Sequence, residues 1–187
     1  MSKTFAMSSI LPLINYGQKD FGENKVQEAM EKWTDIKEDF KDIKLHLIGK
    51  LQTNKVKYVI PLFDYIHSLD NLKLAKKISE QQIKFKKELK IFIQVNIGSE
   101  IQKNGIDINN LVSFYDTCVN DLNLNIVGLM CIPPNEDSSI YFSRMKNLSK
   151  KIKLAELSMG MSNDYLEACT YSSTFLRIGS KIFGNRN

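Results

Sequence analysis

The chain has 187 residues, of which 43% are hydrophobic and 25% are charged, and its formal net charge at pH 7 is +5. This length and apolar content predict a single domain over residues 1–187 with a buried core. Its apolar runs are far shorter than the ~18 residues that a bilayer span requires, and the N-terminus has no signal-peptide pattern. The composition therefore excludes a membrane-spanning protein, and we expect a cytoplasmic one.

The positive charge comes from lysines that are dispersed along the chain. A nucleic-acid surface would interleave basic and aromatic residues on one face, and the sequence has no such stripe, so we expect solvated lysines and no nucleic-acid partner. Cys118, Cys131 and Cys169 are far apart, with no second Cys or His at metal-ligand spacing. They are typical of reduced, buried thiols, and we expect no metal.

Seven short apolar runs are typical of buried parallel strands, and helical segments separate them. In chain order the runs cover residues 19–23, 44–48, 65–68, 91–96, 126–131, 156–159 and 175–178. A further helical stretch, residues 7–16, precedes the first run. This alternation is typical of an α/β fold with a parallel sheet.

Three helical segments have apolar residues at the spacing of one helix face, and we expect these stripes to pack against the sheet. The stripes consist of Val26, Ala29, Met30 and Trp33; of Leu72, Ala75 and Ile78; and of Leu111, Tyr115, Cys118 and Val119.

Seven strands are one fewer than a (β/α)₈ barrel needs for closure. We therefore expect a (β/α)₈ TIM-type barrel that lacks the N-terminal helix and most of the first strand, with residues 1–4 as the tail of that strand. A doubly wound open sheet is the alternative. Its dinucleotide-binding form would carry a Gly-x-Gly-x-x-Gly turn, which is not in the sequence.

Two turns of small residues follow the last two expected strands, at residues 157–162 and 176–180. In barrels of this kind, the loops after the last two strands often bind a phosphate together with the start of a short helix. Glycine permits close approach of the backbone, and serine adds a hydroxyl donor. The pair of turns predicts a phosphorylated ligand, although each turn alone could equally be a well-capped helix start.

Lys3 would stand at the end of the first strand, across the barrel mouth from these turns. An amine in that position can condense with an aldehyde whose phosphate is held at the opposite rim, which suggests pyridoxal 5′-phosphate (PLP). Composition alone would make Lys3 a solvated residue. His46 and His67 lie in apolar strands, where a hydrogen-bonded core histidine is the commoner outcome. Glu23 and Glu28 fit surface ion pairs as well as proton chemistry.

Blocks of sequence along essentially the whole chain resemble one family, the pyridoxal phosphate homeostasis proteins. The blocks, in order, are residues 2–4, 17–28, 46–55, 66–70, 94–97, 103–105, 128–130, 157–162, 177–180 and 183–186. The resemblance implies a single-domain barrel related to the N-terminal domain of alanine racemase, with PLP held as an internal aldimine. The chain departs from the family by starting at the lysine, by Ser180 in place of threonine and by Leu45 in place of tryptophan.

The resemblance also implies a set of cofactor-binding residues. Lys3 would form the aldimine, Arg177 would face the pyridine nitrogen, and Asn24 would lie beside the cofactor, although Asn24 could equally cap the following helix. The other members of the set are His46, Met159, Ser162, Gly179 and Ser180, of which the last three would hold the phosphate.

A guanidinium against the pyridine nitrogen offers only donors and so favours the unprotonated ring, which is a weak electron sink. The resemblance therefore implies a protein of PLP homeostasis that holds the cofactor without catalytic turnover. A PLP-dependent amino-acid racemase is the alternative, with His46 or a residue of a partner subunit as the second base. The expected partners are PLP and PLP-dependent apoenzymes, with no membrane contact, and the expected state is a monomer or a weak dimer.

Overall fold

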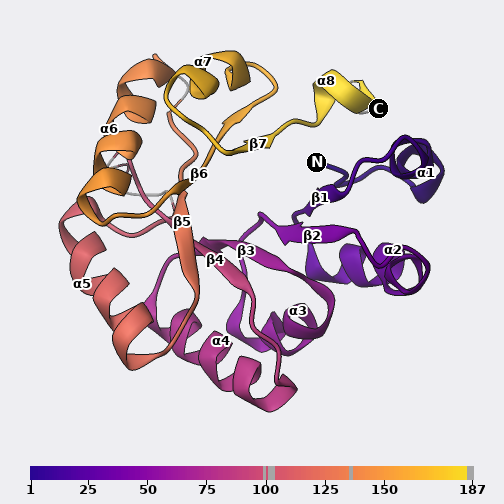
Figure 1. Cartoon of the computed structure of the whole chain (residues 1–187), viewed down its shortest axis with the longest axis horizontal. Coiled ribbons are helices and arrows are strands. Elements are labelled where there is room, and N and C mark those ends of the chain that lie inside the picture. The colour runs from indigo at the N-terminus through magenta and orange to yellow at the C-terminus, as the bar shows by residue number, and fades with distance from the viewer. Residues whose placement is uncertain (99, 101–103, 135–136, 185–187) are drawn as a thin grey trace.

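A computed structural model of the protein describes residues 1–98, 100, 104–134 and 137–184. Its sheet has seven parallel strands that pair in chain order, and the helices lie around the outside of the strands (Figure 1). The strands are β1 (Asp20–Glu23), β2 (Lys44–Leu47), β3 (Tyr65–Leu69), β4 (Lys90–Gln94), β5 (Ile126–Met130), β6 (Glu156–Met161) and β7 (Phe175–Arg177). The expected barrel is confirmed, with each strand ending within two residues of its expected bounds. The doubly wound alternative is wrong, because its strand order would reverse within the sheet.

Helices make the crossovers that parallel pairing requires. They are α1 (Met7–Asn15), α2 (Val26–Asp39), α3 (Val56–Leu62), α4 (Leu72–Phe85), α5 (Leu111–Asp116), α6 (Ser138–Lys151), α7 (Tyr165–Thr170) and α8 (Ser180–Phe183). Single helical turns at Thr53–Lys55 and Ile108–Asn110 precede α3 and α5, and the stretch Thr117–Asp121 extends α5 with wider π-helical turns.

The apolar stripes of the helices pack against the strands, with one correction. In α2 the expected residues Val26, Ala29 and Trp33 are buried. In α4 the stripe was expected to begin at Leu72, but Leu72 is 44% exposed and Leu74 is buried instead. Leu72 is the first residue of that helix, directly after its Asn cap, and the buried face of the helix begins at Leu74 and continues through Ala75 and Ile78.

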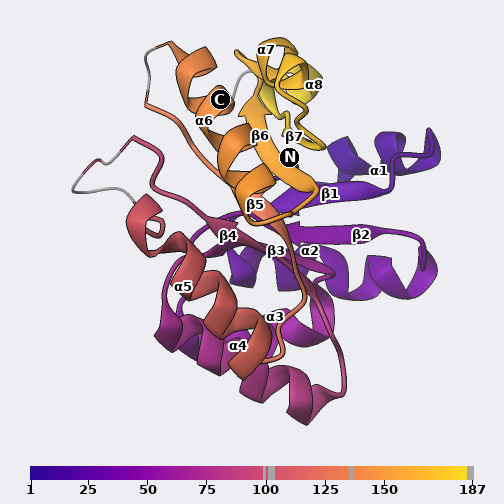
Figure 2. The same cartoon turned by 60° about the vertical axis from the view of Figure 1, so that its left-hand side comes forward.

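Residues 1 and 2 lie where a first strand would stand, between β1 and the end of β7. The nitrogen of Met1 donates to the carbonyl of Ile178 (2.6 Å), and the amide of Ser2 donates to the carbonyl of Gly22 (3.0 Å). The N-terminus accordingly lies beside β1 and faces the segment after β7 in both views (Figures 1 and 2). The expected role of the N-terminal tail is confirmed for these two residues, and they nearly close the barrel at the carboxyl ends of its strands.

Candidate functional site

A cavity of about 590 Å³ opens at the carboxyl ends of β6 and β7. This volume lies in the range of small-molecule sites. The cavity is lined by three segments that are distant in sequence: Met1, Lys3 and Phe5; residues 161–164; and Arg177, Gly179, Ser180 and Gly184. The lysine and both turns that the sequence suggested thus surround one cavity.

The two turns are joined to each other, and the first of them has no space for a side chain at its glycine. Gly160 has a φ of +90°, and a Cβ there would lie 2.6 Å from the Cβ of Ala168, so only glycine fits at the end of β6. The amide of Gly179 donates to the hydroxyl of Ser162 across the two turns (3.2 Å). Serine hydroxyl and turn backbone are therefore held side by side, as a phosphate site requires.

A buried carboxylate anchors the N-terminal segment. Glu23, at the end of β1, is fully buried, and its Oε1 accepts from the hydroxyl of Ser2 (2.8 Å) and from the indole of Trp33 (3.0 Å). Lys32 on α2 forms an ion pair with the same oxygen at 2.7 Å. Of the two alternatives that the sequence left open for Glu23, the surface ion pair is therefore wrong, because its ion pair with Lys32 is buried.

Lys32 also binds the backbone on both sides of Lys3. Its Nζ donates to the carbonyls of Ser2 (3.0 Å) and Phe5 (3.4 Å). Glu28 accepts from Lys32 (2.9 Å) and from the amide that follows Lys3 in the chain (2.6 Å). The Phe5 ring stacks on a ring of α8 at 4.6 Å, which ties this segment to the far side of the cavity. The backbone that carries Lys3 is thus fixed before and after it.

Arg177, at the end of β7, is buried and lines the inner wall of the cavity. Its Nη1 donates to the carbonyl (2.6 Å) and the hydroxyl (2.9 Å) of Ser158, and its Nη2 donates to the carbonyl of Cys131 (2.8 Å). Burial lowers the pKa of the guanidinium from its ordinary value of 12.5. Among the described residues, these contacts use three of its five N–H donors.

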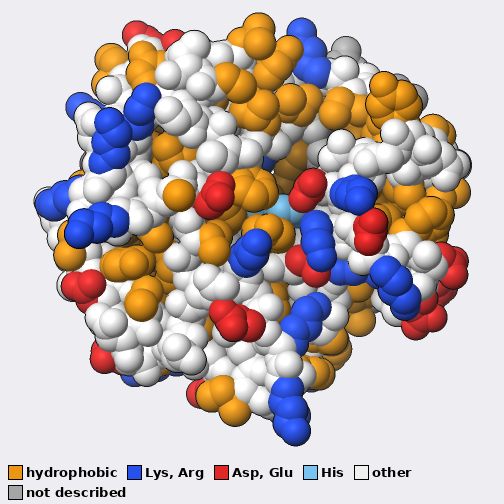
Figure 3. All heavy atoms as spheres, in the orientation of Figure 1, with side chains coloured by type: hydrophobic (Ala, Val, Ile, Leu, Met, Phe, Trp, Pro, Cys, Tyr) orange, Lys and Arg blue, Asp and Glu red, His pale blue; other side chains and the backbone are white. Residues whose placement is uncertain are grey.

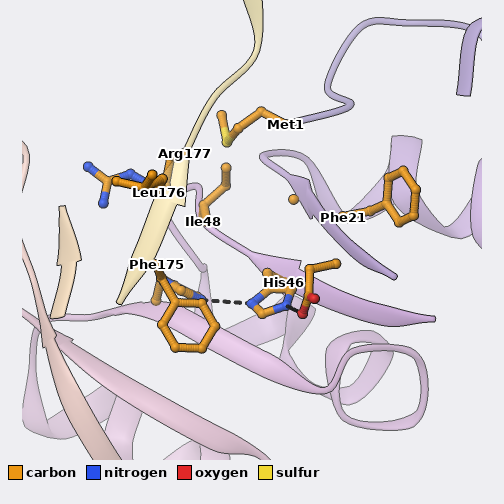
Figure 4. Close-up of a pocket in the computed structure, with 10 residues that line it drawn as sticks. Met1, Phe21, His46, Ile48, Phe175, Leu176 and Arg177 are labelled. Atoms are coloured by element: carbon orange, nitrogen blue, oxygen red, sulfur yellow. Dashed lines mark hydrogen bonds and ion pairs between the residues drawn. The ribbon is translucent and has the colours of Figure 1, made fainter. Parts of the chain in front are cut away.

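A second, smaller cavity of about 60 Å³ adjoins the first and shares Met1 and Arg177 with it. His46 lines it, and Figure 4 shows both hydrogen bonds of this ring, while the side chains of Met1 and Ile48 point toward each other above it. A histidine is visible in a hollow near the middle of the molecular face in Figure 3. This cavity lies on the side of the barrel where β1 and β7 do not pair.

The eight residues expected to bind the cofactor lie in the larger cavity, in the adjoining smaller cavity, or outside both. Around the larger cavity the structure brings together Lys3, Ser162, Arg177, Gly179 and Ser180. His46 lies in the adjoining cavity, and Met159 is fully buried in β6 outside both linings. Asn24 lies after β1, also outside both, with its backbone carbonyl packed against Gly49. Its alternative role as a helix cap is wrong, because α2 is capped at residue 25 without a side-chain hydrogen bond.

Sequence reasoning did not single out Phe5 and Asp164 in the larger cavity, or Asp20 as a polar partner beneath it. The expectation of a hydrogen-bonded core histidine is confirmed for His67, whose partners are His46 and Ser158. No local signal indicated that His67 and Ser158 contact each other. Residue 103 and residues 185–186, which belong to the matching sequence blocks, lie outside the described residues.

Among the residues that the structure describes, no group of His, Cys, Asp and Glu could hold a metal, and no helix is long and apolar enough to cross a membrane.

The barrel and the cavity at its carboxyl end define a protein of the alanine racemase N-terminal-domain class, and the model of the family described as "Alanine racemase, N-terminal domain" matches residues 3–187. Within this class, the chain belongs to the pyridoxal phosphate homeostasis protein family. Pyridoxal phosphate homeostasis proteins of Aquifex aeolicus and of Synechocystis sp. are each 37% identical to it. The alignments cover 99% and 100% of this chain and 85% and 89% of those relatives. The resemblance found in the sequence is confirmed.

Solved structures give the same result. PipY of Synechococcus elongatus without PLP superimposes with a TM-score of 0.92 and 31% identity, over 98% of this chain and 90% of PipY. The structure of PipY with PLP bound superimposes with a TM-score of 0.90. Alanine racemase of Bartonella henselae, at 14% identity and a TM-score of 0.77, shares the barrel fold over 98% of this chain and 53% of its own length.

Proposed function

We propose that this protein binds pyridoxal 5′-phosphate covalently through Lys3 and serves in the homeostasis of this cofactor without catalytic turnover. One observation carries the proposal: Lys3 and the two small-residue turns, far apart in sequence, line the same cavity. The names of the family's relatives and the PLP-bound structure of PipY support the same ligand.

The residues around the cavity fit the cofactor's two reactive ends. The ε-amine of Lys3 can condense with an aldehyde and release water, which gives a covalent link. The hydroxyls of Ser162 and Ser180 can donate to a phosphate at the other end, and the amide of Gly179, which donates to Ser162, leaves that hydroxyl its own hydrogen for the phosphate. Asp164 lies in the same lining, but its Oδ1 already accepts from the amide of residue 161 (2.6 Å).

Arg177 supports a role in binding over a role in catalysis. PLP supplies an electron sink when its ring nitrogen is protonated. A guanidinium donates hydrogen bonds and repels an added proton, so Arg177 placed against the ring nitrogen would favour the unprotonated ring. We propose PLP-dependent apoenzymes in the cytoplasm as recipients of the cofactor, and a monomer or weak dimer as the working state.

The racemase alternative would require a second acid or base next to the cofactor. His46 was the candidate within this chain, but its Nε2 lies 3.0 Å from Asp20 and its Nδ1 lies 3.0 Å from His67. Both ring nitrogens are thus in use within the adjoining cavity. No observation on the described residues favours the racemase, and we retain the non-catalytic function.

Covalent labelling tests the proposed function. The purified protein is incubated with PLP, passed through a desalting column, reduced with borohydride and digested for mass spectrometry. We expect one pyridoxyl group per chain, on Lys3, because the part of the chain that the structure describes places no other lysine in the cavity lining with both turns. Lys3→Arg, which keeps the charge but cannot condense, should lose this label, whereas Lys50→Arg on the surface should keep it.

Two results would contradict the proposal. One is a label spread over surface lysines at equal levels in the native protein and in Lys3→Arg. The other is lysine-dependent racemisation of an amino acid well above the level of Lys3→Arg, which would replace the non-catalytic function by the racemase.

A further inference from the structure

A continuous chain of hydrogen bonds crosses the barrel interior beneath the cavity. Asp20 Oδ1 lies 3.0 Å from His46 Nε2, and His46 Nδ1 lies 3.0 Å from His67 Nε2. His67 Nδ1 lies 2.9 Å from the Oγ of Ser158, which in turn accepts from Arg177 at 2.9 Å. Residues from β1, β2, β3, β6 and β7 thus connect a partly exposed carboxylate to the buried guanidinium.

The carboxylate of Asp20 and the neutral state of the two rings together assign the protons in this chain. An ionised carboxylate only accepts, so His46 carries its hydrogen on Nε2 and donates to Asp20. The bare Nδ1 of His46 then accepts from the Nε2–H of His67, and the bare Nδ1 of His67 accepts the hydroxyl hydrogen of Ser158. The Oγ of Ser158 accepts from the guanidinium of Arg177, which only donates. All donors point the same way, from the cation to the anion, and both imidazoles are neutral Nε2–H tautomers.

Aromatic packing holds the two imidazoles in this arrangement. The ring of His46 stacks on Tyr65 with centroids 4.2 Å apart, and the ring of His67 stacks on Phe92 at 4.3 Å. Phe175 packs edge-on against both His67 and Phe92. Such apolar surroundings strengthen hydrogen bonds and make an unpaired polar atom costly. The chain therefore has one favoured hydrogen-bond pattern.

We propose that His67, Ser158 and His46 are positioning residues that orient the guanidinium of Arg177 toward the cofactor cavity. His46 accepts from the Nε2–H of His67, which leaves the Nδ1 of His67 bare to accept the hydroxyl hydrogen of Ser158. That hydrogen then points away from Arg177, and a lone pair of Ser158 Oγ faces the guanidinium. The negative charge of Asp20 at the outer end stabilises this direction along the whole chain. The role toward the cofactor rests on the proposed PLP binding, whereas the orientation of Arg177 does not.

The hydrogen-bond directions are measurable without any cofactor. The chain has two histidines, so the imidazole nitrogens in long-range ¹H–¹⁵N NMR spectra are assigned by the variants His46→Gln and His67→Gln. At pH 8, above the ordinary imidazole pKa, both rings should show a protonated Nε2 and an unprotonated Nδ1. An Nδ1–H tautomer at either ring would overturn the proposed chain.

The orientation of Arg177 has its own readout, because the chain has only three arginines, at positions 144, 177 and 186. In the native protein, the guanidinium hydrogens of Arg177 should exchange slowly with water. Ser158→Ala and His67→Phe should each accelerate this exchange about 10-fold, in line with the loss of one charged hydrogen bond. Tyr65→Phe, which keeps the ring stacked on His46, serves as the matched control and should leave the exchange unchanged.

Binding of PLP completes the test. If the native protein binds PLP, Ser158→Ala and His67→Phe should bind it about 10-fold more weakly than native protein and Tyr65→Phe. Should His67→Phe fail to fold, as judged by circular dichroism, the smaller change Ser158→Ala decides. Native-like exchange of Arg177 in a folded Ser158→Ala variant would overturn the inference. Failure of the native protein to bind PLP would instead refute the proposed function, and the exchange result would still decide the role of the chain.

Discussion

Replacement of Lys32 by methionine should lower the free energy of unfolding by about 3 kcal/mol, because it leaves the carboxylate of Glu23 buried without its cation. Glu23 is fully buried and the Lys32 side chain is only 12% exposed, so little water can replace the ammonium. Two neutral donors, from Ser2 and Trp33, remain on the carboxylate and keep the loss near the lower end of the usual range. Urea unfolding at pH 7 measures it.

An exposed ion pair provides the matched control for this substitution. Lys77 and Glu80 pair at 2.8 Å with side chains that are 40% and 62% exposed. Lys77→Met should therefore change the free energy of unfolding by less than about 1 kcal/mol. The double variant Lys32→Met with Glu23→Gln should recover part of the loss, because a neutral amide tolerates burial better than an unpaired charge. Equal losses in Lys32→Met and Lys77→Met would show that the buried pair has no special role.

The same variant connects stability to the proposed function. Lys32 binds the carbonyls of Ser2 and Phe5, on either side of Lys3, so its loss frees the backbone that carries the reactive amine. The yield of pyridoxyl label on Lys3 should fall in Lys32→Met at PLP concentrations that saturate the native protein. Lys77→Met should label like native protein. Unchanged labelling would mean that the packing of Phe5 alone suffices to hold the segment.

The sequence predicted the barrel well because buried parallel strands leave a local signal, an apolar run between helical segments. The two turns and Lys3 were found for a similar reason, since carboxyl ends of neighbouring strands meet at one rim. The role of Lys32 had no such signal. Its spacing from Glu28 is that of an ordinary surface pair on a helix, and only the N-terminal segment that covers it makes it a buried contact.

The polar chain was likewise not predictable from local pattern. His67 and Ser158 are 91 positions apart, and each stands in an apolar strand where a single polar residue is compatible with many partners. Their contact depends on barrel closure, which brings β3 and β6 to face each other across the interior. The order of strands and helices was enough to predict the barrel. The hydrogen bonds between inward side chains could not be predicted, because these side chains become neighbours only when the strands pair in their final register.

Acid should weaken the protein through one buried histidine, His67. Burial lowers the pKa of His67 well below its ordinary value of 6.5, and the positive charge of Arg177 adds to this effect. Below pH 6.5 the unfolded chain therefore binds a proton at this residue that the folded protein does not bind. The contribution of His67 to the free energy of unfolding is fully present above pH 6.5. Below that value the free energy of unfolding should fall by up to about 1.4 kcal/mol for each pH unit.

Urea unfolding at pH 8, 6.5 and 5.5 measures the slope of the free energy of unfolding against pH. The control variant His67→Phe removes the titrating ring and keeps an aromatic partner for Phe92. The pKa of Asp20 is lowered by its hydrogen bond to His46, so its contribution is present above its ordinary value of 3.8 and is lost only at more acidic pH. The pKa of Glu28 is also lowered, because hydrogen bonds from Lys32 and from the amide of residue 4 outweigh the opposing effect of burial. Its contribution to stability is likewise present above its ordinary pKa of 4.5 and is lost only at more acidic pH. The difference between native protein and His67→Phe over pH 5.5–8 thus isolates His67. If the free energies of unfolding of native protein and His67→Phe changed equally with pH, His67 would take up its proton as readily in the folded protein as in the unfolded chain. The hydrogen-bonded chain, which requires a neutral His67, would then not orient Arg177 in mild acid.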